Sequence, residues 1–427
     1  MNNPAQDSYQ LYIGGEWVDA SDGATLDSFC PATGEKLSTI ADATREDVDR
    51  AVEVAWKAFE TWGKTDKTER AAILNKVADI IEENAEKLAL LETLDNGKPI
   101  RETRAIDIAY SVDHFRYFAG VLLADTGEAD ILPGNMMSLV LHEPIGVVGQ
   151  IVPWNFPFLM AAWKLAPVLA AGDCTVFKPS STTSLSVLEF AKLTQDVIPA
   201  GVFNVITGKG SKSGQYLLEN QRISKLAFTG STEVGRDVAR AAADRLIPAT
   251  LELGGKSANI IFPDAQWDMV IDGVQLGILF NQGQVCCAGS RIFVHEDIYD
   301  KFVEDAVAAF NKVKVGMPWE DDTQMGSQID ERQMNKILGY IDIAKQEGGK
   351  VLCGGERYTE GECAKGAFLK PTMIEVPNNS CRCAQEEIFG PVAVVIKFKD
   401  EQEVIDMAND SVYGLGGGRA ISIELSV

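Results

Sequence analysis

The central part of the chain alternates between short β-like runs and helix-like segments, and this alternation limits the fold more than any other feature. The alternation extends from residue 146 to residue 262. The predicted strands are 147–152, 174–177, 203–206, 225–228, 249–253 and 258–262, and the predicted helices are 158–171, 184–197, 211–220 and 231–243. Such alternation is typical of a mostly parallel, doubly wound α/β sheet.

The flanking regions extend this organisation. Residues 44–124 have helical patterning, with a capping box at Thr44–Asp47 and predicted helices at 44–62, 68–94 and 102–123. Residues 125–147 contain Pro133-Gly134 between β-like runs and predict a hairpin. Alternation resumes after residue 264, with predicted helices at 298–313 and 331–346 and strands at 292–294, 369–375 and 392–398. A boundary near 253–258 would make this a second α/β domain.

Composition narrows the class of function. The chain has 427 residues, with 39 basic and 62 acidic side chains and a net charge of −23. A surface this acidic repels phosphate backbones and anionic lipid, so we expect neither nucleic acid nor membrane partners. The N-terminus has no secretory pattern, and the 8 cysteines are too sparse for a disulfide scaffold. We therefore expect a cytoplasmic protein with reduced thiols.

Two strand-to-helix turns are candidates for phosphate binding. Gly208-Lys-Gly210-Ser-Lys-Ser-Gly214 lets backbone N–H groups approach a pyrophosphate, although its spacing is one residue longer than G-x-G-x-x-G. The same residues also suit an ordinary turn between a strand and a helix. Phe228-Thr-Gly-Ser231 is similar, because Ser231 can cap the following helix, bind a phosphate, or do both.

Two further segments carry reactive side chains. Asn281–Arg291 contains adjacent cysteines, Cys286 and Cys287, of which at most one is expected to be a nucleophile, and a buried structural role is the alternative. Glu252 lies between apolar neighbours at a predicted strand end, where a raised pKa would make it a general base. The alternative for Glu252 is an ion pair with Lys256.

A metal centre is not expected. The three histidines, His114, His142 and His295, are scattered, and Cys381-Arg-Cys383 is too short and isolated for a zinc site. A Ser-His-Asp mechanism is disfavoured for the same reason.

Taken together, six blocks in order resemble the NAD(P)-dependent aldehyde dehydrogenase superfamily, over residues 10–418. The amino-acid sequence as a whole is similar to those of bacterial acetaldehyde and short aliphatic aldehyde dehydrogenases. The blocks are Pro153-Trp-Asn-Phe-Pro157, Lys178-Pro-Ser, Phe228-Thr-Gly-Ser-Thr232, Leu251-Glu-Leu-Gly-Gly-Lys256, Gly283-Gln-Val-Cys286 and Glu386-Glu-Ile-Phe-Gly-Pro391.

The resemblance implies an architecture and an assembly. It implies a Rossmann-like cofactor-binding domain from residues 1–124 and 148–253, an oligomerisation hairpin at 125–147, and a catalytic domain at 254–427. It also implies a homodimer or homotetramer.

The resemblance also implies a reaction. A small aldehyde would be oxidised to its carboxylic acid through a thiohemiacetal and a thioester on Cys286. Glu252 matches the general base, and Asn155 matches the amide that holds the oxyanion together with the Cys286 N–H group. Phe156, Trp163 and Phe280 match walls of the aldehyde tunnel.

The implied cofactor is NAD or NADP. Lys178 matches the ribose-binding lysine, and Glu387 and Phe389 match contacts to the nicotinamide half. Ser181 stands where NAD-preferring members often have a glutamate that would repel a 2′-phosphate, so we predict that NADP is tolerated. The remaining cofactor-binding matches are Trp154, Gly210, Gly214, Phe228, Gly230, Ser231 and Leu253.

Three alternatives stay open, and the first follows from a departure from the family pattern. After Gly418 the sequence leaves the family pattern, and its ending resembles a frameshift or premature stop, which would weaken the oligomer contact. One alternative is therefore a truncated, catalytically inactive nucleotide-binding remnant. A second is a CoA-acylating aldehyde dehydrogenase, in which a water-activating Glu252 would have no use. A third is a structural thiol protein with a coincidental nucleotide-binding fold.

Overall fold

The computed structural model describes residues 3–420, which form two compact units. The first unit comprises Met1–Phe29, Lys36–Asp95 and Thr103–Glu252, and the second comprises Cys30–Glu35, Asn96–Glu102 and the chain from Leu253 onward. The ending that departs from the family pattern falls largely on residues 421–427, outside the described residues. Within the described part, no helix has the length and apolar character needed to cross a membrane.

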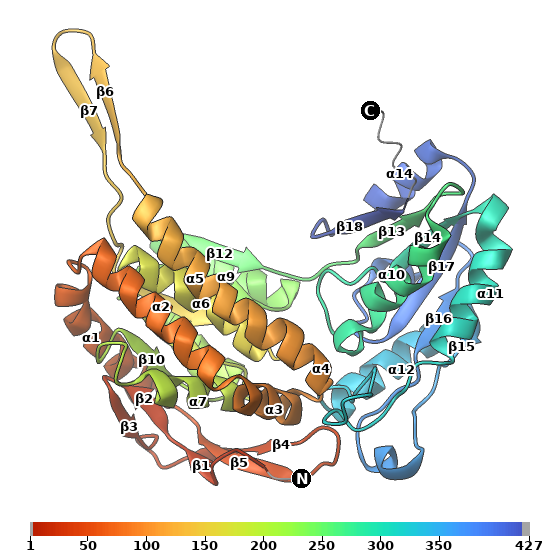
Figure 1. Cartoon of the computed structure of the whole chain (residues 1–427), viewed down its shortest axis with the longest axis horizontal. Helices are drawn as coiled ribbons and strands as arrows, with labels where there is room; N and C mark the ends of the chain where they lie inside the picture. Colours follow the sequence, from red (N-terminus) through yellow and green to blue (C-terminus); the bar gives the residue numbers. More distant parts are fainter. Residues whose placement is uncertain (1–2, 421–427) are drawn as a thin grey trace. The chain divides into compact units, whose positions relative to one another are not determined.

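A seven-stranded sheet is the centre of the first unit (Figure 1). Its strand order is β12-β11-β8-β9-β10-β2-β3, and the first five strands are parallel. The strands are β8 Val147–Ile151, β9 Cys174–Lys178, β10 Phe203–Val205, β11 Lys225–Thr229, β12 Ala249–Glu252, β2 Leu11–Ile13 and β3 Glu16–Val18. Because β8 starts the parallel run and strands are added on both sides of it, the sheet is doubly wound, as the alternation predicts.

Helices of the first unit follow the predicted segments with three changes. They are α1 Arg45–Trp62, α2 Lys67–Glu83, α3 Ala85–Asn96, α5 Ala109–Ala124, α6 Pro157–Ala171, α7 Leu185–Thr194, α8 Gln215–Glu219 and α9 Thr232–Arg245. The capping box is confirmed: the Thr44 side chain accepts from the Asp47 N–H, and the Asp47 side chain accepts from the Thr44 N–H.

The three changes occur where the backbone leaves regular α geometry. The single helix expected at 68–94 is broken at Asn84, which ends α2. The helix expected at 102–123 starts as α4 (Ile100–Glu102) and a π-helical segment, Thr103–Ile108, before α5. The helix expected at 211–220 likewise starts with a π-helical turn, Gly210–Gly214. Apolar spacing does not distinguish these variants from an α-helix.

A small sheet near the N-terminus was not predicted. It has the order β1-β5-β4, formed by Ser8–Tyr9, Lys36–Ala41 and Thr25–Phe29. Two of these strands pair antiparallel, and β1 lies parallel to β5. Strands of this length carry too few residues for a clear alternation of apolar and polar positions.

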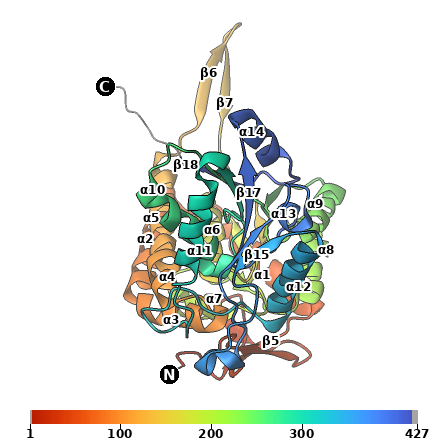
Figure 2. The same cartoon turned by 90° about the vertical axis from the view of Figure 1, so that its right-hand side faces the viewer.

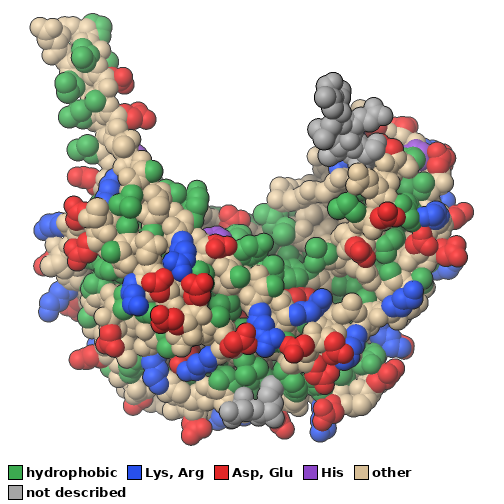
Figure 3. Space-filling model, viewed as in Figure 1, with side chains coloured by type: hydrophobic (Ala, Val, Ile, Leu, Met, Phe, Trp, Pro, Cys, Tyr) green, Lys and Arg blue, Asp and Glu red, His purple; other side chains and the backbone are tan. Residues whose placement is uncertain are grey.

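The predicted hairpin is present as β6 (Glu128–Leu132) and β7 (Met136–Val140), which pair only with each other. It projects from the first unit in both ribbon views (Figures 1 and 2). Green hydrophobic side chains are visible along it in Figure 3. Ile131 is 84% exposed, Leu141 71% and Met137 66%. The hairpin thus leaves apolar surface uncovered.

The second unit is built on a six-stranded sheet with the order β15-β16-β17-β14-β13-β18. Only β15 is antiparallel to its neighbour. The strands are β13 Ala258–Ile261, β14 Arg291–His295, β15 Lys350–Cys353, β16 Thr372–Glu375, β17 Val392–Phe398 and β18 Gly417–Ala420. The helices are α10 Trp267–Leu279, α11 Tyr299–Phe310, α12 Glu331–Gln346, α13 Arg382–Gln385 and α14 Glu401–Asn409. One buried cluster joins α12 to the sheet strands.

Two short segments that the sequence assigned to the first domain pack with the second unit. The Ala367 N–H donates to the Pro31 carbonyl at 3.1 Å, and the Ser327 N–H donates to the Gly97 carbonyl at 3.2 Å. These contacts join residues far apart in the chain, so a sequence pattern cannot reveal them.

Candidate active site

In the first unit, the candidate residues gather at the carboxyl ends of the parallel strands. Asn155 follows β8, Lys178 ends β9, Ser231 follows β11 and Glu252 ends β12. Gly210 and Gly214 lie in the turn after β10. Ligands of doubly wound sheets bind at this edge, next to the strand where the order reverses, which here is β8.

Lys178 and Gly214 are in contact. A Cβ placed on Gly214 would lie 3.5 Å from Lys178 Cδ, and the Lys178 ammonium donates to the Pro179 carbonyl at 2.9 Å. Burial lowers the pKa of Lys178 to about 8, and the negative charge of Asp42 acts in the opposite direction. Two of the predicted cofactor contacts are therefore adjacent, and Ser181 lies half-buried in the loop that follows Lys178.

The turn after β11 contains the helix N-cap that the sequence predicts at Ser231. The Ser231 side chain accepts from the Val234 N–H at 3.3 Å, so Ser231 is the N-cap of α9. The Gly230 N–H donates to the Glu252 carbonyl at 3.0 Å. A Cβ on Gly230 would lie 2.5 Å from the buried Phe228 ring, which explains the glycine. The capping prediction is confirmed, and phosphate binding stays a prediction.

The segment after β8 is largely buried. Trp154 is half-buried, and Asn155 and Phe156 are buried, with Phe156 at the N-cap of α6. Trp163, one helical stretch further on, is 46% exposed and stacks on His114 of α5 with ring centroids 5.4 Å apart.

Glu252 differs from the expectation. The sequence placed it among apolar neighbours, yet its side chain is exposed at the end of the edge strand β12. An edge strand has a neighbour on one side only, so apolar flanking residues do not enclose it. Its charge acts on Lys164 on α6: burial lowers the pKa of Lys164 to about 8, and the negative charge of Glu252 acts in the opposite direction.

In the second unit, the candidate residues lie ahead of the parallel strands. Lys256 precedes β13, Cys286 precedes β14, and Glu387 and Phe389 precede β17. Because β13, β14 and β17 are neighbouring parallel strands, these segments meet at one edge of the sheet. This edge is the amino end, the opposite of that used in the first unit.

The loop before Cys286 has an unusual backbone. Asn281, Gln282 and Gly283 all have positive φ, at 47°, 55° and 72°. Positive φ is costly for residues with a Cβ and is tolerated where surrounding contacts hold it. The Gln282 side-chain amide donates to the Ser327 carbonyl at 2.9 Å, and the Asn281 N–H donates to Glu102 Oε2 at 2.9 Å. Phe280, which opens this loop, is half-buried.

The Glu386–Pro391 block supports this loop directly. A Cβ on Gly283 would lie 2.1 Å from the Gly390 carbonyl oxygen, so only glycine fits there. Phe389 has a φ of 61°, and the Gln333 side-chain amide donates to its carbonyl at 2.7 Å. Gln333, on α12, was not among the predicted residues, and nothing in its local sequence marks it.

Glu387 reaches the Leu251–Lys256 block. Its Oε1 accepts from the Gly255 N–H at 3.1 Å, and a Cβ on Gly254 would lie 2.6 Å from its Oε2. Burial raises the pKa of Glu387. A Cβ on Gly255 would lie 2.2 Å from the Cys286 carbonyl oxygen. The half-buried Leu253 precedes these glycines, so three of the six blocks meet in this unit.

The adjacent thiols interact with each other, which the sequence did not anticipate. Cys286 is half-buried and Cys287 exposed. The hydrogen bond from the Cys286 thiol lowers the pKa of Cys287 to about 6. The contact with Cys287, followed by burial and the charge of Glu387, raises the pKa of Cys286. The two thiols therefore influence each other in opposite directions, which lowers the pKa of Cys287 and raises that of Cys286.

The two units thus define a class of protein: an α/β protein with the candidate nucleotide contacts at one edge of its first sheet and a cysteine pair after a constrained loop in its second unit. Thiols presented in this way serve covalent catalysis. Among residues 3–420, the structure shows no group of three or more His, Cys, Asp and Glu side chains placed to hold a metal ion.

Comparison with known proteins specifies the family. The model of the aldehyde dehydrogenase family matches residues 17–420. The chain is 48% identical to aldehyde dehydrogenase B of Escherichia coli, over 96% of this chain and 81% of that protein. The chain belongs to the aldehyde dehydrogenase family and is an oxidoreductase of that family.

Solved structures agree with the fold. The NAD+ complex of aldehyde dehydrogenase from Bacillus cereus superposes with a TM-score of 0.95 at 42% identity, covering 97% of this chain and 84% of that one. Betaine aldehyde dehydrogenase from Staphylococcus aureus, also in complex with NAD+, has a TM-score of 0.95 at 40% identity, with 97% and 83% covered. The predicted fold class is confirmed.

Proposed function

We propose that this chain oxidises a small aldehyde to the carboxylic acid, with NAD or NADP as cofactor and Cys286 as the nucleophile. The observation that carries the proposal is the loop before Cys286. Three consecutive left-handed residues, held by buried hydrogen bonds and by the close contact between Gly283 and Gly390, place one cysteine at a fixed position. Strain of this kind is retained where a side chain must be presented in one geometry.

The cofactor proposal rests on the fit of the first unit. Gly210 has no atom within 4 Å of an added Cβ, so the turn after β10 is free of side chains where a pyrophosphate could approach the backbone. Ser231 starts α9 with its N–H groups at the same sheet edge, and Lys178 provides a buried ammonium. Trp154, Ser181, Phe228 and Gly230 complete the proposed contacts, and Leu253, Glu387 and Phe389 are proposed for the nicotinamide half. The chemistry that NAD or NADP supplies when bound is two-electron oxidation of the carbon attached to sulfur.

The remaining steps are derived from the chain's own residues. Cys286 gives up its proton to solvent, and its sulfur forms a bond to the aldehyde carbon as the C=O π bond opens and leaves its electron pair on oxygen. The oxygen that becomes negative is stabilised by the Asn155 amide and the Cys286 N–H, at about 3 kcal/mol per donor. In the second half, Glu252 takes a proton from water, the hydroxide attacks the thioester carbon, and the C–S bond breaks to release the acid. The Lys164 ammonium interacts electrostatically with the Glu252 carboxylate.

A small, apolar substrate is proposed from the aromatic residues. Phe156, Trp163 and Phe280 are candidates for contact with the aldehyde carbon chain. Acetaldehyde and propionaldehyde are therefore the first substrates to test, with betaine aldehyde as a charged comparison.

The test is absorbance at 340 nm with purified protein, acetaldehyde, and NAD or NADP. We expect a rise that Cys286→Ala abolishes and Cys287→Ala retains. A rise that survives Cys286→Ala would refute the assignment of the nucleophile. Cofactor binding without any rise would instead support the inactive nucleotide-binding alternative. A rise that requires added CoA, with acyl-CoA as product, would support the acylating alternative over hydrolysis.

We also propose that the hairpin joins copies of this chain. The observation is the uncovered apolar face of β6 and β7, whose two edges have no further strand partner among the described residues. Exposed apolar strands of this kind mark interaction surfaces. Light scattering should show an oligomer that Ile131→Asp dissociates, whereas a monomer at micromolar concentration would contradict the proposal.

A further inference from the structure

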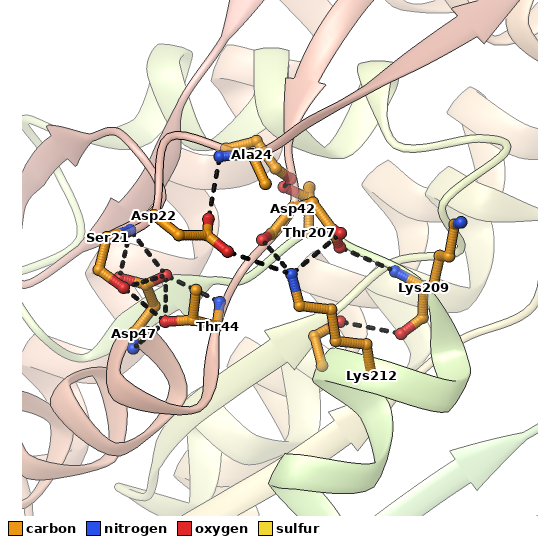
Figure 4. Close-up of polar contacts among 11 residues, drawn as sticks. Ser21, Asp22, Ala24, Asp42, Thr44, Asp47, Thr207, Lys209 and Lys212 are labelled. Atoms are coloured by element: carbon orange, nitrogen blue, oxygen red, sulfur yellow. Dashed lines mark hydrogen bonds and ion pairs between the residues drawn. The ribbon is translucent and has the colours of Figure 1, made fainter.

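Asp42 lies at the centre of the contacts around the turn that follows β10 (Figure 4). It is buried and follows the last residue of β5, far in sequence from that turn. Its Oδ2 accepts from the Lys212 ammonium at 3.1 Å, and its Oδ1 accepts from the Lys209 N–H at 3.3 Å. The Lys212 ammonium also donates to the Asp42 backbone carbonyl at 3.2 Å. One buried carboxylate therefore binds the turn through both a side chain and the backbone.

The backbone next to Asp42 is joined to the same turn. The Thr207 hydroxyl donates to the Ala41 carbonyl at 2.5 Å, and the Ala43 N–H donates to the Thr207 carbonyl at 3.1 Å. Gly208 has a φ of 131°, and a Cβ there would lie 2.6 Å from Asp42 Oδ1. The carboxylate is thus packed against the glycine that starts the turn, and a larger residue could not occupy that position.

Asp42 also acts on Lys178. It is the charged group that favours the protonated ammonium of Lys178, against the effect of burial. The far end of the turn contacts the same lysine, because Gly214 packs on its side chain. Asp42 therefore contacts the turn at Gly208, Lys209 and Lys212, and Gly214 at the far end of the turn contacts Lys178, the last residue of β9.

We propose that Asp42 is a positioning residue for the cofactor, holding the start of the Gly208–Gly214 turn in place and orienting the Lys212 side chain within it. This inference rests on the proposed function of Lys178 and the turn in cofactor binding. Neither role requires Asp42 to touch the cofactor. A neutral residue at position 42 would loosen the turn and make the Lys178 charge easier to lose.

The charges around these groups support a specific role. The charge of Asp42 acts on the pKa of Lys178. The charges of Asp42, Asp22 and Tyr216 act on the pKa of Lys212. Asp22 lies 3.7 Å from the Lys212 ammonium and is not among the groups that act on Lys178. Removing Asp22 should therefore affect the turn without affecting the charge of Lys178, which makes Asp22→Asn a matched control.

The experiment measures NADH binding by fluorescence from pH 6.5 to 9.5, with the full chain and without aldehyde. In the unsubstituted protein the Kd should rise as the pH passes about 8, where Lys178 loses its proton. In Asp42→Asn the turn loses the carboxylate that binds the Lys212 ammonium, so the Kd should be about tenfold higher, and the rise with pH should shift to lower pH because the charge that opposes the effect of burial on Lys178 is gone. Asp22→Asn and Lys212→Met should weaken binding to a similar extent at every pH and leave the midpoint where it was.

The outcomes distinguish the inference about Asp42 from the proposed role of Lys178 in cofactor binding. If Asp42→Asn unfolds, Asp42→Glu retains the charge with a longer side chain and should keep the pH midpoint while raising the Kd at all pH values. A Kd for NADH that is unchanged at every pH in a folded Asp42→Asn protein would overturn the inference. If the unsubstituted protein and Lys178→Met bind NADH equally well, the assignment of Lys178 fails, and the inference about Asp42 fails with it.

Discussion

Gly283 and Gly390 are in direct backbone contact: a Cβ placed on Gly283 would lie 2.1 Å from the carbonyl oxygen of Gly390. The two glycines belong to different motifs, more than a hundred residues apart. Through this contact the loop that carries Cys286 is positioned by the loop that carries Glu387 and Phe389. The thiol and the proposed cofactor contacts of the second unit therefore depend on each other for their positions.

A substitution at Gly283 should separate these loops. Gly283→Ala places a methyl group against a carbonyl and requires a φ of 72° from a residue with a Cβ. We expect a loss of about 3 kcal/mol in the free energy of unfolding of the second unit, and little or no aldehyde oxidation. Urea unfolding followed by circular dichroism measures the first effect.

The control is a glycine that has room for a side chain. Gly273 lies within α10 and has no atom within 4 Å of an added Cβ. Gly273→Ala should be neutral or raise stability by up to about 1 kcal/mol, because alanine favours the helix. Equal losses from the two substitutions would contradict the close-contact explanation.

The cysteine pair should show coupled titration. The contact with the Cys286 thiol lowers the pKa of Cys287 to about 6. Cys286→Ala removes that contact, so the pKa of Cys287 should rise toward about 8.5, the ordinary value for a thiol. Iodoacetamide labelling of Cys287, followed by mass spectrometry across pH 5–9, measures this shift.

The reciprocal variant completes this test. In Cys287→Ala the pKa of Cys286 should fall, because the contact with Cys287 is the first cause of its elevation. A labelling midpoint for Cys287 that is the same with and without Cys286 would show that the two thiols do not share a hydrogen bond in solution.

Ser181 should permit the phosphorylated cofactor. A serine places no negative charge beside a 2′-phosphate, whereas a glutamate at this position would repel it. We expect kcat/KM with NADP within about tenfold of that with NAD. Ser181→Glu should lower kcat/KM with NADP, which corresponds to an increase of about 1–2 kcal/mol in the activation free energy. Steady-state kinetics with both cofactors decides this, and a thousandfold preference of the unsubstituted chain for NAD would refute it.

Asp95 should make stability depend on pH. It is wholly buried, accepts from the Ser28 hydroxyl at 2.6 Å and the Leu185 N–H at 3.0 Å, and burial raises its pKa to about 7. The unfolded carboxyl has a pKa of about 3.9, so the folded state binds more protons between these values. Stability should therefore fall as the pH rises from about 4 to about 7, by on the order of 4 kcal/mol.

The measurement is Tm at pH 5 and pH 8. The Tm of Asp95→Asn should lose this pH dependence. At pH 8 it should be higher relative to the Tm of the unsubstituted protein than at pH 5. Asp244→Asn, at an exposed position on α9, should change neither value by much. A pH dependence that survives in Asp95→Asn would assign the effect to another group.

The strongest local signals predicted the structure well. The Thr44–Asp47 capping box begins α1, residues 331–346 form α12, residues 392–398 form β17, and Pro133-Gly134 turns the hairpin. Each of these depends on a few neighbouring residues. The prediction joined α2 to α3 across Asn84 and missed the small N-terminal sheet together with β2, β3, α10, β15, α14 and β18. In those places the apolar spacing either continued through a break or covered too few residues.

For the candidate site, the motifs identified which residues to examine but not how they are held. Glu252 was expected among apolar side chains, and the structure exposes it because β12 is an edge strand. Gln333 and Asp42 carry no motif at all, yet one hydrogen-bonds the Phe389 carbonyl and the other binds the Gly208–Gly214 turn.

The sequence by itself determined the α/β class, the order of most strands and helices, and the family, because each of these depends on patterns among near neighbours in the chain. Only the tertiary structure decided that candidate residues occupy the carboxyl edge of one sheet and the amino edge of the other. It alone decided that Gly283 meets Gly390, and that Asp42 reaches Lys212 and acts on Lys178. Such contacts depend on how strands pair across long separations, and no local pattern of side chains encodes that pairing.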